Sequence, residues 1–128
     1  MSPREAFVDH LTLHVRDLAA SRTFYAAALA PWGSREVKGD WGLAIGPPGS
    51  EDVAIVQGEP SGPIHLALGA PDRETVERFY EAAVAAGGRD NGPPGERPHY
   101  HPGYYAAYVL DPDGNNVEAV FHEPEEAE

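Results

Sequence analysis

The sequence predicts an α+β fold made of two copies of one module, each with a strand, a helix and about three further strands. Three observations support this prediction: an internal repeat, stretches in which apolar and polar residues alternate, and glycine and proline clusters between those stretches. Residues 9–33 and 64–88 align without a gap at an offset of 55, and 10 of the 25 aligned positions are identical. A repeat of this length indicates one supersecondary unit used twice. Because residues 1–128 fit a single domain, the two copies must share one core.

The first module, about residues 7–58, begins with a strand and a helix. Apolar and polar residues alternate from Val8 to Val15, which is the period of a half-buried strand. Asp17 offers a side-chain acceptor for the start of a helix over about 18–30, and Pro31 ends that helix. The short strands that follow are expected at 36–38, 41–45 and 53–57.

The second module, about residues 62–122, repeats this order. Its first strand covers 64–68, and Asp72 caps a helix that Gly87 ends. Apolar side chains at helical spacing form one stripe along this helix: Val76, Phe79, Tyr80, Ala83 and Val84. The last two strands, joined by the hairpin turn sequence DPDG, are expected at 104–110 and 115–121.

Fourteen glycines and thirteen prolines mark the loops of the chain. They concentrate at 46–49, 58–63 and 92–102, between the periodic stretches. The stretch 58–63 joins the two modules. The acidic tail at 123–128 is expected to be a solvated chain end.

The composition excludes several classes of partner. With 9 basic and 21 acidic residues, the formal charge of -12 repels phosphate backbones, so no nucleic-acid partner is expected. The absence of cysteine excludes a disulfide framework and a thiolate zinc site. The first ten residues do not form a signal peptide, and no apolar run is long enough to cross a bilayer. We therefore expect a cytoplasmic protein without a membrane partner.

Two histidines and one glutamate are the candidate metal ligands. His10 and His65 occupy the same position in the two repeats. By strand alternation each histidine faces away from the leucines beside it, and Glu118 faces away from Val117 and Ala119. If the helices cover the apolar sides, all three ligands project onto the opposite, concave face of the combined sheet. Two imidazoles and one carboxylate suit a divalent cation that keeps open positions for substrate or water.

Three motifs carry a family resemblance: HLTLHVRDL followed by FY, IHLAL in the second half, and DPDGNNVE near the end. With these motifs, residues 10–121 resemble the vicinal oxygen chelate superfamily, which includes glyoxalases, extradiol dioxygenases, fosfomycin-resistance enzymes and bleomycin-resistance proteins. The resemblance implies two βαβββ modules that form a half-open barrel around a shared site. It also implies a homodimer.

The resemblance further implies one divalent metal, Mn²⁺, Fe²⁺, Ni²⁺ or Zn²⁺, bound by His10, His65 and Glu118. A small-molecule substrate with vicinal oxygens would chelate the open positions of this metal. We therefore expect a metal-dependent enzyme of the glyoxalase or dioxygenase kind. Lyase, isomerase and ring-opening dioxygenase chemistry are all left open, because the ligand set does not fix the reaction.

Further site residues follow from the same resemblance. Tyr108, ten residues before Glu118, matches a substrate-contacting tyrosine, and His99 matches a histidine of extradiol dioxygenases. Thr12 aligns with a functional threonine of fosfomycin-resistance enzymes, and His101 lies beside His99 in a proline-flanked stretch. We expect these four residues to take part in catalysis, with the imidazoles able to move protons near neutral pH.

Strand alternation adds two residues to the expected substrate pocket. Tyr104 shares the face of Tyr108, and His14 shares the face of His10. The residues that should instead point toward the helices are Tyr105, Ala107 and Val109.

The sequence also departs from the family pattern, and this leaves a rival function open. The strand at 53–57 lacks the glutamate that glyoxalases usually add as a fourth ligand. The rival is a metal-free protein that sequesters a flat, cationic ligand, as bleomycin-resistance proteins do. The residues that could stack on such a ligand are Trp32, Trp41, Tyr104 and Tyr108. A third possibility is a protein that keeps the fold with a vestigial site.

Overall fold

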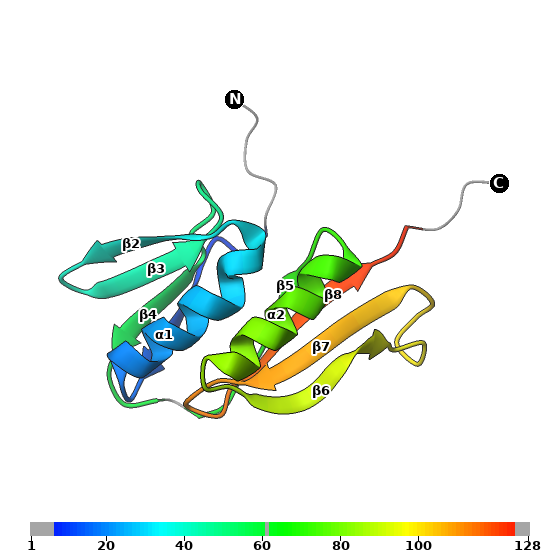
Figure 1. Ribbon diagram of the computed structural model, residues 1–128. Helices are drawn as coiled ribbons and strands as arrows, with labels where there is room; N and C mark the ends of the chain where they lie inside the picture. The colour runs from blue at the N-terminus through cyan, green and yellow to red at the C-terminus, as the bar shows by residue number, and fades with distance from the viewer. Residues whose placement is uncertain (1–6, 61, 125–128) are drawn as a thin grey trace.

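The computed structural model describes residues 7–60 and 62–124. It contains two four-stranded sheets, and the two long helices lie side by side on the same side of both sheets (Figure 1). The prediction of an α+β fold with two βαβββ modules is confirmed. In the described part of the chain, the two sheets do not close into a barrel. Among the described residues no helix is long and apolar enough to cross a membrane.

The first module forms a mixed sheet with the strand order β1-β4-β3-β2, in which β1 is an edge strand parallel to β4. The predicted cap is confirmed, because the side chain of Asp17 accepts a hydrogen bond from the backbone N–H of Ala20. The elements are β1 (Leu11–Val15), α1 (Leu18–Leu29), the 3₁₀ turn η1 (Ala30–Trp32), β2 (Arg35–Gly39), β3 (Gly42–Gly46) and β4 (Val53–Gln57).

The second module repeats this topology with the strand order β5-β8-β7-β6, and β5 is again an edge strand parallel to its neighbour. Asp72 caps the helix as predicted, and Gly87 follows its end with a positive φ of 102°. On the predicted apolar stripe, Val76, Phe79 and Ala83 are buried, whereas Val84 is partly exposed. The elements are β5 (His65–Gly69), α2 (Arg73–Ala85), β6 (Arg89–Glu96), β7 (Tyr104–Leu110) and β8 (Asn116–His122).

One hydrophobic core serves both modules, as the repeat required. It contains the helix-facing residues of both sheets together with the inner faces of α1 and α2. Phe24 and Phe79, which are repeat partners, are both fully buried in it. In β7, Tyr105, Ala107 and Val109 join this core, while Ala106 and Tyr108 belong to a separate cluster on the other face of the sheet. The predicted alternation along β7 is therefore confirmed.

The strand β6 corrects the prediction of a loop that starts at residue 92. Its sequence RDNGPPGE is rich in glycine and proline, yet it pairs with β7 up to Glu96. Proline lacks a backbone N–H, but β6 is the outer strand of its sheet and its register shifts twice, so the missing donors do not disrupt a ladder on both sides. At Gly92, with φ 149°, an added Cβ would lie 2.9 Å from Cδ1 of Tyr108, so only glycine allows this approach.

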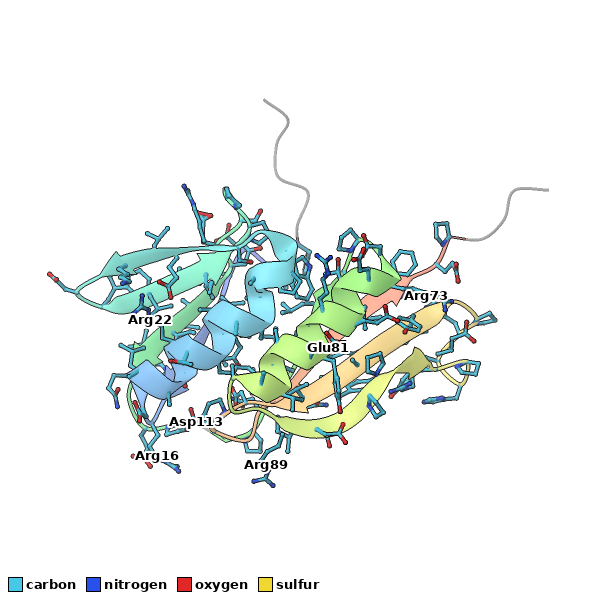
Figure 2. All side chains as sticks on the ribbon, viewed as in Figure 1. Arg16, Arg22, Arg73, Glu81, Arg89 and Asp113 are labelled. Carbon is cyan, nitrogen blue, oxygen red and sulfur yellow. The ribbon has the colours of Figure 1, made fainter. Side chains whose placement is uncertain are left out.

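The turn between β7 and β8 fixes the register of the strand that carries Glu118. Asp111 is buried and accepts hydrogen bonds from the backbone N–H groups of Asp113 and Asn115 and from the hydroxyl of Tyr25 in α1. Asp113 reaches the first module and accepts from the backbone N–H of Arg16 at 3.3 Å (Figure 2). The predicted DPDG turn is confirmed, and it also ties the two modules together.

Candidate functional site

The candidate site lies on the face of the second sheet that points away from the helices. Side chains alternate along β7 and β8, so Tyr104, Tyr108 and Glu118 share this face. Tyr108 and Glu118 are directly opposite each other in the register of the two strands. His65 starts the neighbouring strand β5 on the same face, and its ring lies 6.2 Å from the ring of Tyr108.

Glu118 is the centre of the cluster. Its side chain is only 1% exposed, and Oε1 lies 2.6 Å from Nε2 of His65, whose side chain is 52% exposed. The other oxygen, Oε2, accepts a short hydrogen bond from the hydroxyl of Tyr104. Both oxygens of a buried carboxylate are therefore held by different neighbours, one from β5 and one from β7. This fixes the orientation of the carboxylate toward His65.

Both tyrosines of the site remain protonated at neutral pH. Burial raises the pKa of Tyr104, and its hydrogen bond to the Glu118 carboxylate raises that pKa further. Burial and the nearby charge of Glu118 also raise the pKa of Tyr108, to about 12. Neither hydroxyl is ionised at neutral pH, so each can donate a hydrogen bond, and its oxygen can also accept one.

The cluster fits a divalent cation on two grounds. First, an imidazole nitrogen and a carboxylate oxygen, both of them donors preferred by transition metals, share a proton at 2.6 Å. A cation that replaced this proton would move the two atoms apart, to roughly 2.9–3.4 Å for two ligands of one ion. Second, the hydroxyl of Tyr108 is buried and makes no well-formed hydrogen bond among the described residues, although the hydroxyls of Tyr100 and Tyr104 lie near it. A buried hydroxyl without a partner costs stability and therefore points to a ligand that would satisfy it.

Thr12 and His14 lie in β1 of the other sheet, and His10 directly precedes that strand. The side chain of His10 is 61% exposed, and its Nδ1 lies 2.9 Å from the carboxylate of Asp9. Thr12 and His14 are exposed on the face of β1 that points away from the core. Within residues 7–60 and 62–124, no group of three or more histidine, aspartate or glutamate side chains is arranged to hold a metal. A single chain thus brings His65 and Glu118 together, but it does not bring His10 to them.

The loop before β7 places a group of aromatic rings beside Glu118. The ring of His101 lies 5.3 Å from that of Tyr104, and the ring of Tyr100 lies 4.8 Å from it on another side. The ring of His99 contacts Tyr100, at 4.3 Å, and reaches Tyr104 only through that ring. Of the two histidines expected to take part in catalysis, His101 is therefore the one in ring contact with Tyr104.

Two residues of this region were missed by the sequence analysis. His122 ends β8 opposite Tyr104, and its Nδ1 lies 3.0 Å from Nε2 of His101. The same alternation that selected Glu118 also selects residue 122 on that face, but the strand was expected to end at 121. Arg97 places its guanidinium 5.3 Å from the ring centre of Tyr108, a cation–π contact that no sequence motif signalled.

The two tryptophans lie away from this cluster. Nε1 of Trp32 donates to the backbone oxygen of Gly69, and its ring contacts Phe79 in the core. Trp32 also lines a cavity of about 190 Å³ between the two modules, with Leu68 on the opposite side. Trp41 is exposed beside the β2–β3 turn. Of the four aromatic residues expected to stack on a sequestered ligand, only Tyr104 and Tyr108 belong to the site.

The fold is shared with a known family. The model of the Glyoxalase/Bleomycin resistance protein/Dioxygenase superfamily matches residues 7–119. The chain therefore belongs to that superfamily. No curated protein matches the chain.

Solved structures show the same architecture. A glyoxalase/bleomycin resistance protein from Albidiferax ferrireducens T118 is 28% identical, with a TM-score of 0.77 over 93% of this chain and 100% of its own. A fosfomycin resistance protein from Mesorhizobium loti is 24% identical, with a TM-score of 0.68 over 94% of this chain and 95% of its own. A lactoylglutathione lyase from Agrobacterium tumefaciens is 21% identical, with a TM-score of 0.67 over 93% and 95% of the two chains. At their lower identities, the last two support the fold alone.

Proposed function

We propose that the protein is a divalent-metal-dependent enzyme that acts on a small substrate with vicinal oxygens. The observation that carries the proposal is the buried carboxylate of Glu118, held 2.6 Å from Nε2 of His65 and next to the unpartnered hydroxyl of Tyr108. A buried carboxylate is costly unless it is paired, and this one is aimed at a metal-ligating side chain. The proposal includes two kinds of reaction: glyoxalase-like lyase or isomerase chemistry, and extradiol-type dioxygenation.

The third metal ligand of the proposal is His10 from a second copy of the chain, which makes the active form a homodimer. His10 is exposed in its own chain and precedes an edge strand. The face of the first sheet that carries Thr12 continues across the sheet into the small and apolar residues Ala54, Ala44 and Val37. Thr12 and Val37 are exposed on this face. A second copy packed there would cover this face and bring His10, Thr12 and His14 to the site.

The chain's own residues would position the substrate and hold its protons. When bound, the cation would act as a Lewis acid on the vicinal oxygens of the substrate. The hydrogen bond from Tyr104 occupies Oε2 of Glu118 and leaves Oε1 as the oxygen that faces His65. The hydroxyl of Tyr108 would donate a hydrogen bond to a substrate oxygen, since its raised pKa keeps it protonated. Burial of Tyr108 and Glu118 excludes water from this side of the site.

The metal content of the purified protein tests this proposal. The full chain, purified without chelator, is expected to contain a divalent metal, and His65→Ala and Glu118→Gln should each lose the equivalent that is bound at Glu118. His10→Ala should show the same loss, whereas His14→Ala, from the same face of β1, serves as the matched control. Equal metal content in the wild type and in all four variants would reject the metal centre.

The same protein preparations also distinguish the proposed metal enzyme from the rival function, which is sequestration of a flat cationic ligand without metal. Its expected signature is stoichiometric ligand binding that chelator does not change. Only Tyr104 and Tyr108 of the four proposed stacking residues lie in the site, which favours the metal enzyme.

A further inference from the structure

A pair of histidines lies next to Tyr104 and outside the proposed metal centre. His101 comes from the loop before β7, and His122 is the last residue of β8. Nε2 of His101 lies 3.0 Å from Nδ1 of His122, and the two rings are nearly parallel, at 18°, with their centres 5.2 Å apart. The two imidazoles thus present ring nitrogens to each other at the surface, where both residues are exposed.

The hydrogen bonds of the pair determine which nitrogen is free to bind a cation. Nδ1 of His101 lies 2.8 Å from the backbone oxygen of Pro102. A carbonyl oxygen only accepts, so Nδ1–H of His101 donates to it and Nε2 carries the lone pair. A backbone carbonyl that fixes one ring nitrogen in this way is the usual support of a metal-ligating histidine.

The distance between the two nitrogens allows both of them to bind the same cation. Two adjacent ligands, each about 2.0–2.1 Å from one metal ion, are roughly 2.9–3.4 Å apart for angles between about 90° and 110°. The observed 3.0 Å falls within this interval. Small rotations of the exposed rings would turn both lone pairs toward one point, once His122 takes its other neutral tautomer, with the proton on Nε2 and the lone pair on Nδ1.

The scaffold around the pair is already rigid. The ring of Tyr104 contacts His101 at 5.3 Å and His122 at 5.2 Å, and it lies edge-on to both. After His122 the chain is held by Glu123, whose N–H donates to the oxygen of Gly103 and whose carboxylate pairs with Arg73 at 2.7 Å. Arg73 stands at the N-terminal end of α2, beside the end of β8 (Figure 2). Little conformational entropy would be lost when this pair binds an ion.

We propose that His101 and His122 form a second cation site, which binds a borderline transition-metal ion such as Cu²⁺, Ni²⁺ or Zn²⁺, with solvent completing the coordination. Imidazole nitrogens select these ions, and Cu²⁺ binds tightest in the series. The net charge of -12 favours cations near the surface. Tyr104 links this site to Glu118, since the same side chain contacts both histidines and donates to the carboxylate.

Titration of the full, metal-stripped chain with Cu²⁺ tests the second site, with affinity measured by calorimetry and ligation by electron paramagnetic resonance. The wild type is expected to show a Cu²⁺ species with two imidazole nitrogens. His101→Ala and His122→Ala should each weaken that species by roughly tenfold or more. His99→Ala, from the same loop, is the matched control and should leave it unchanged.

The variant Glu118→Gln separates this proposal from the proposed function. If Glu118→Gln abolishes one Cu²⁺ equivalent and the His122→Ala variant abolishes another, both sites exist. If His101→Ala and His122→Ala bind Cu²⁺ as the wild type does, the second site is rejected whatever Glu118→Gln does. If only the two histidine variants lose copper, the second site stands and the proposed metal centre at Glu118 fails.

Discussion

Glu118 and Tyr108 are two polar residues that are buried on one face of the second sheet. Folding stability alone does not explain why polar side chains occupy these positions. Each is almost completely buried, Glu118 at 1% and Tyr108 at 9% exposure. The carboxylate has two neighbours that hold it, but the hydroxyl has none among the described residues. Residues that lower stability in a folded protein are concentrated at functional sites, where evolution has retained them for chemistry.

The unpartnered hydroxyl predicts the effect of Tyr108→Phe on stability. Removal of a buried hydroxyl without a partner relieves a desolvation cost, so the metal-free variant should be more stable than the wild type by up to about 1 kcal/mol. Urea denaturation of the metal-free protein measures this difference. The matched control is Tyr105→Phe on the other face of β7, because the Tyr105 hydroxyl donates to Glu77 at 2.7 Å. That control should lose about 0.5–1.5 kcal/mol. A loss in Tyr108→Phe as large as in the control would contradict a free hydroxyl.

The hydrogen bond from Tyr104 to Glu118 predicts a change in metal affinity. Without that hydroxyl, Oε2 of the carboxylate loses its only described donor, and Oε1 is no longer oriented toward His65. Tyr104→Phe should therefore weaken metal binding at the Glu118 centre by roughly 10- to 100-fold. Competition with a chromogenic chelator measures the affinity. Tyr105→Phe, whose side chain lies on the core face of β7, should bind metal as the wild type does. An unchanged affinity in Tyr104→Phe would remove this tyrosine from the site.

The hairpin of β7 and β8 is the element that positions the candidate site, and its turn depends on Asp111. Asp111 accepts from the hydroxyl of Tyr25 at 2.6 Å and from the side-chain amide of Asn115 at 2.9 Å, with all three residues buried. Burial raises the pKa of Tyr25, and the charge of Asp111 raises it further, so the phenol remains a donor. The hairpin therefore anchors the strand of Glu118 to α1 of the other module.

Asp111→Ala should be among the most destabilising single substitutions in the chain. It would leave the hydroxyl of Tyr25 and the amide of Asn115 buried without an acceptor, at a cost of roughly 2–5 kcal/mol. Asp113→Ala is the control in the same turn, since its bonds to Arg16 are long, at 3.3 and 3.4 Å, and its loss should stay below about 1 kcal/mol. Thermal or urea unfolding of both variants provides the comparison. Equal losses in the two variants would show that the buried network is not what stabilises the turn.

Local patterns predicted most elements of the fold, because their cause lies in nearby residues. The caps Asp17 and Asp72 and the DPDG turn act over three or four residues, and all three are confirmed. The strand β6 was missed, because only its position at the edge of the sheet makes two adjacent prolines acceptable. His122 was missed for a related reason. The end of β8 is set by pairing with Tyr104, a residue 18 positions earlier in the chain.

At the scale of the whole molecule, the repeat predicted that the proposed metal ligands lie on the sheet faces that point away from the helices. It did not predict whether one chain or two chains supply the ligands of one site. His65 and Glu118 lie on adjacent strands of one sheet, so their meeting follows from β-sheet register alone. His10 directly precedes β1 of the other sheet, and no hydrogen bonds join the edges of the two sheets among the described strands. The distance between His10 and Glu118 therefore depends on how two modules pack against each other, either within one chain or between two copies. A local sequence pattern carries no information about that choice.

A mixture of two inactive variants distinguishes a site shared between two copies from a site within one chain. His10→Ala and Glu118→Gln should each bind almost no metal at the proposed centre. If the two copies exchange ligands across a twofold axis, a heterodimer of these variants has one site that carries both substitutions and one site that carries neither. Random mixing by refolding together makes half of the dimers heterodimers, so the mixture should recover about a quarter of the wild-type metal content. His14→Ala mixed with Glu118→Gln is the control and should retain about half, from its intact His10 and Glu118 copies. Metal analysis after gel filtration measures each mixture. A His10→Ala and Glu118→Gln mixture that stays near zero would mean that no ligand is shared between copies.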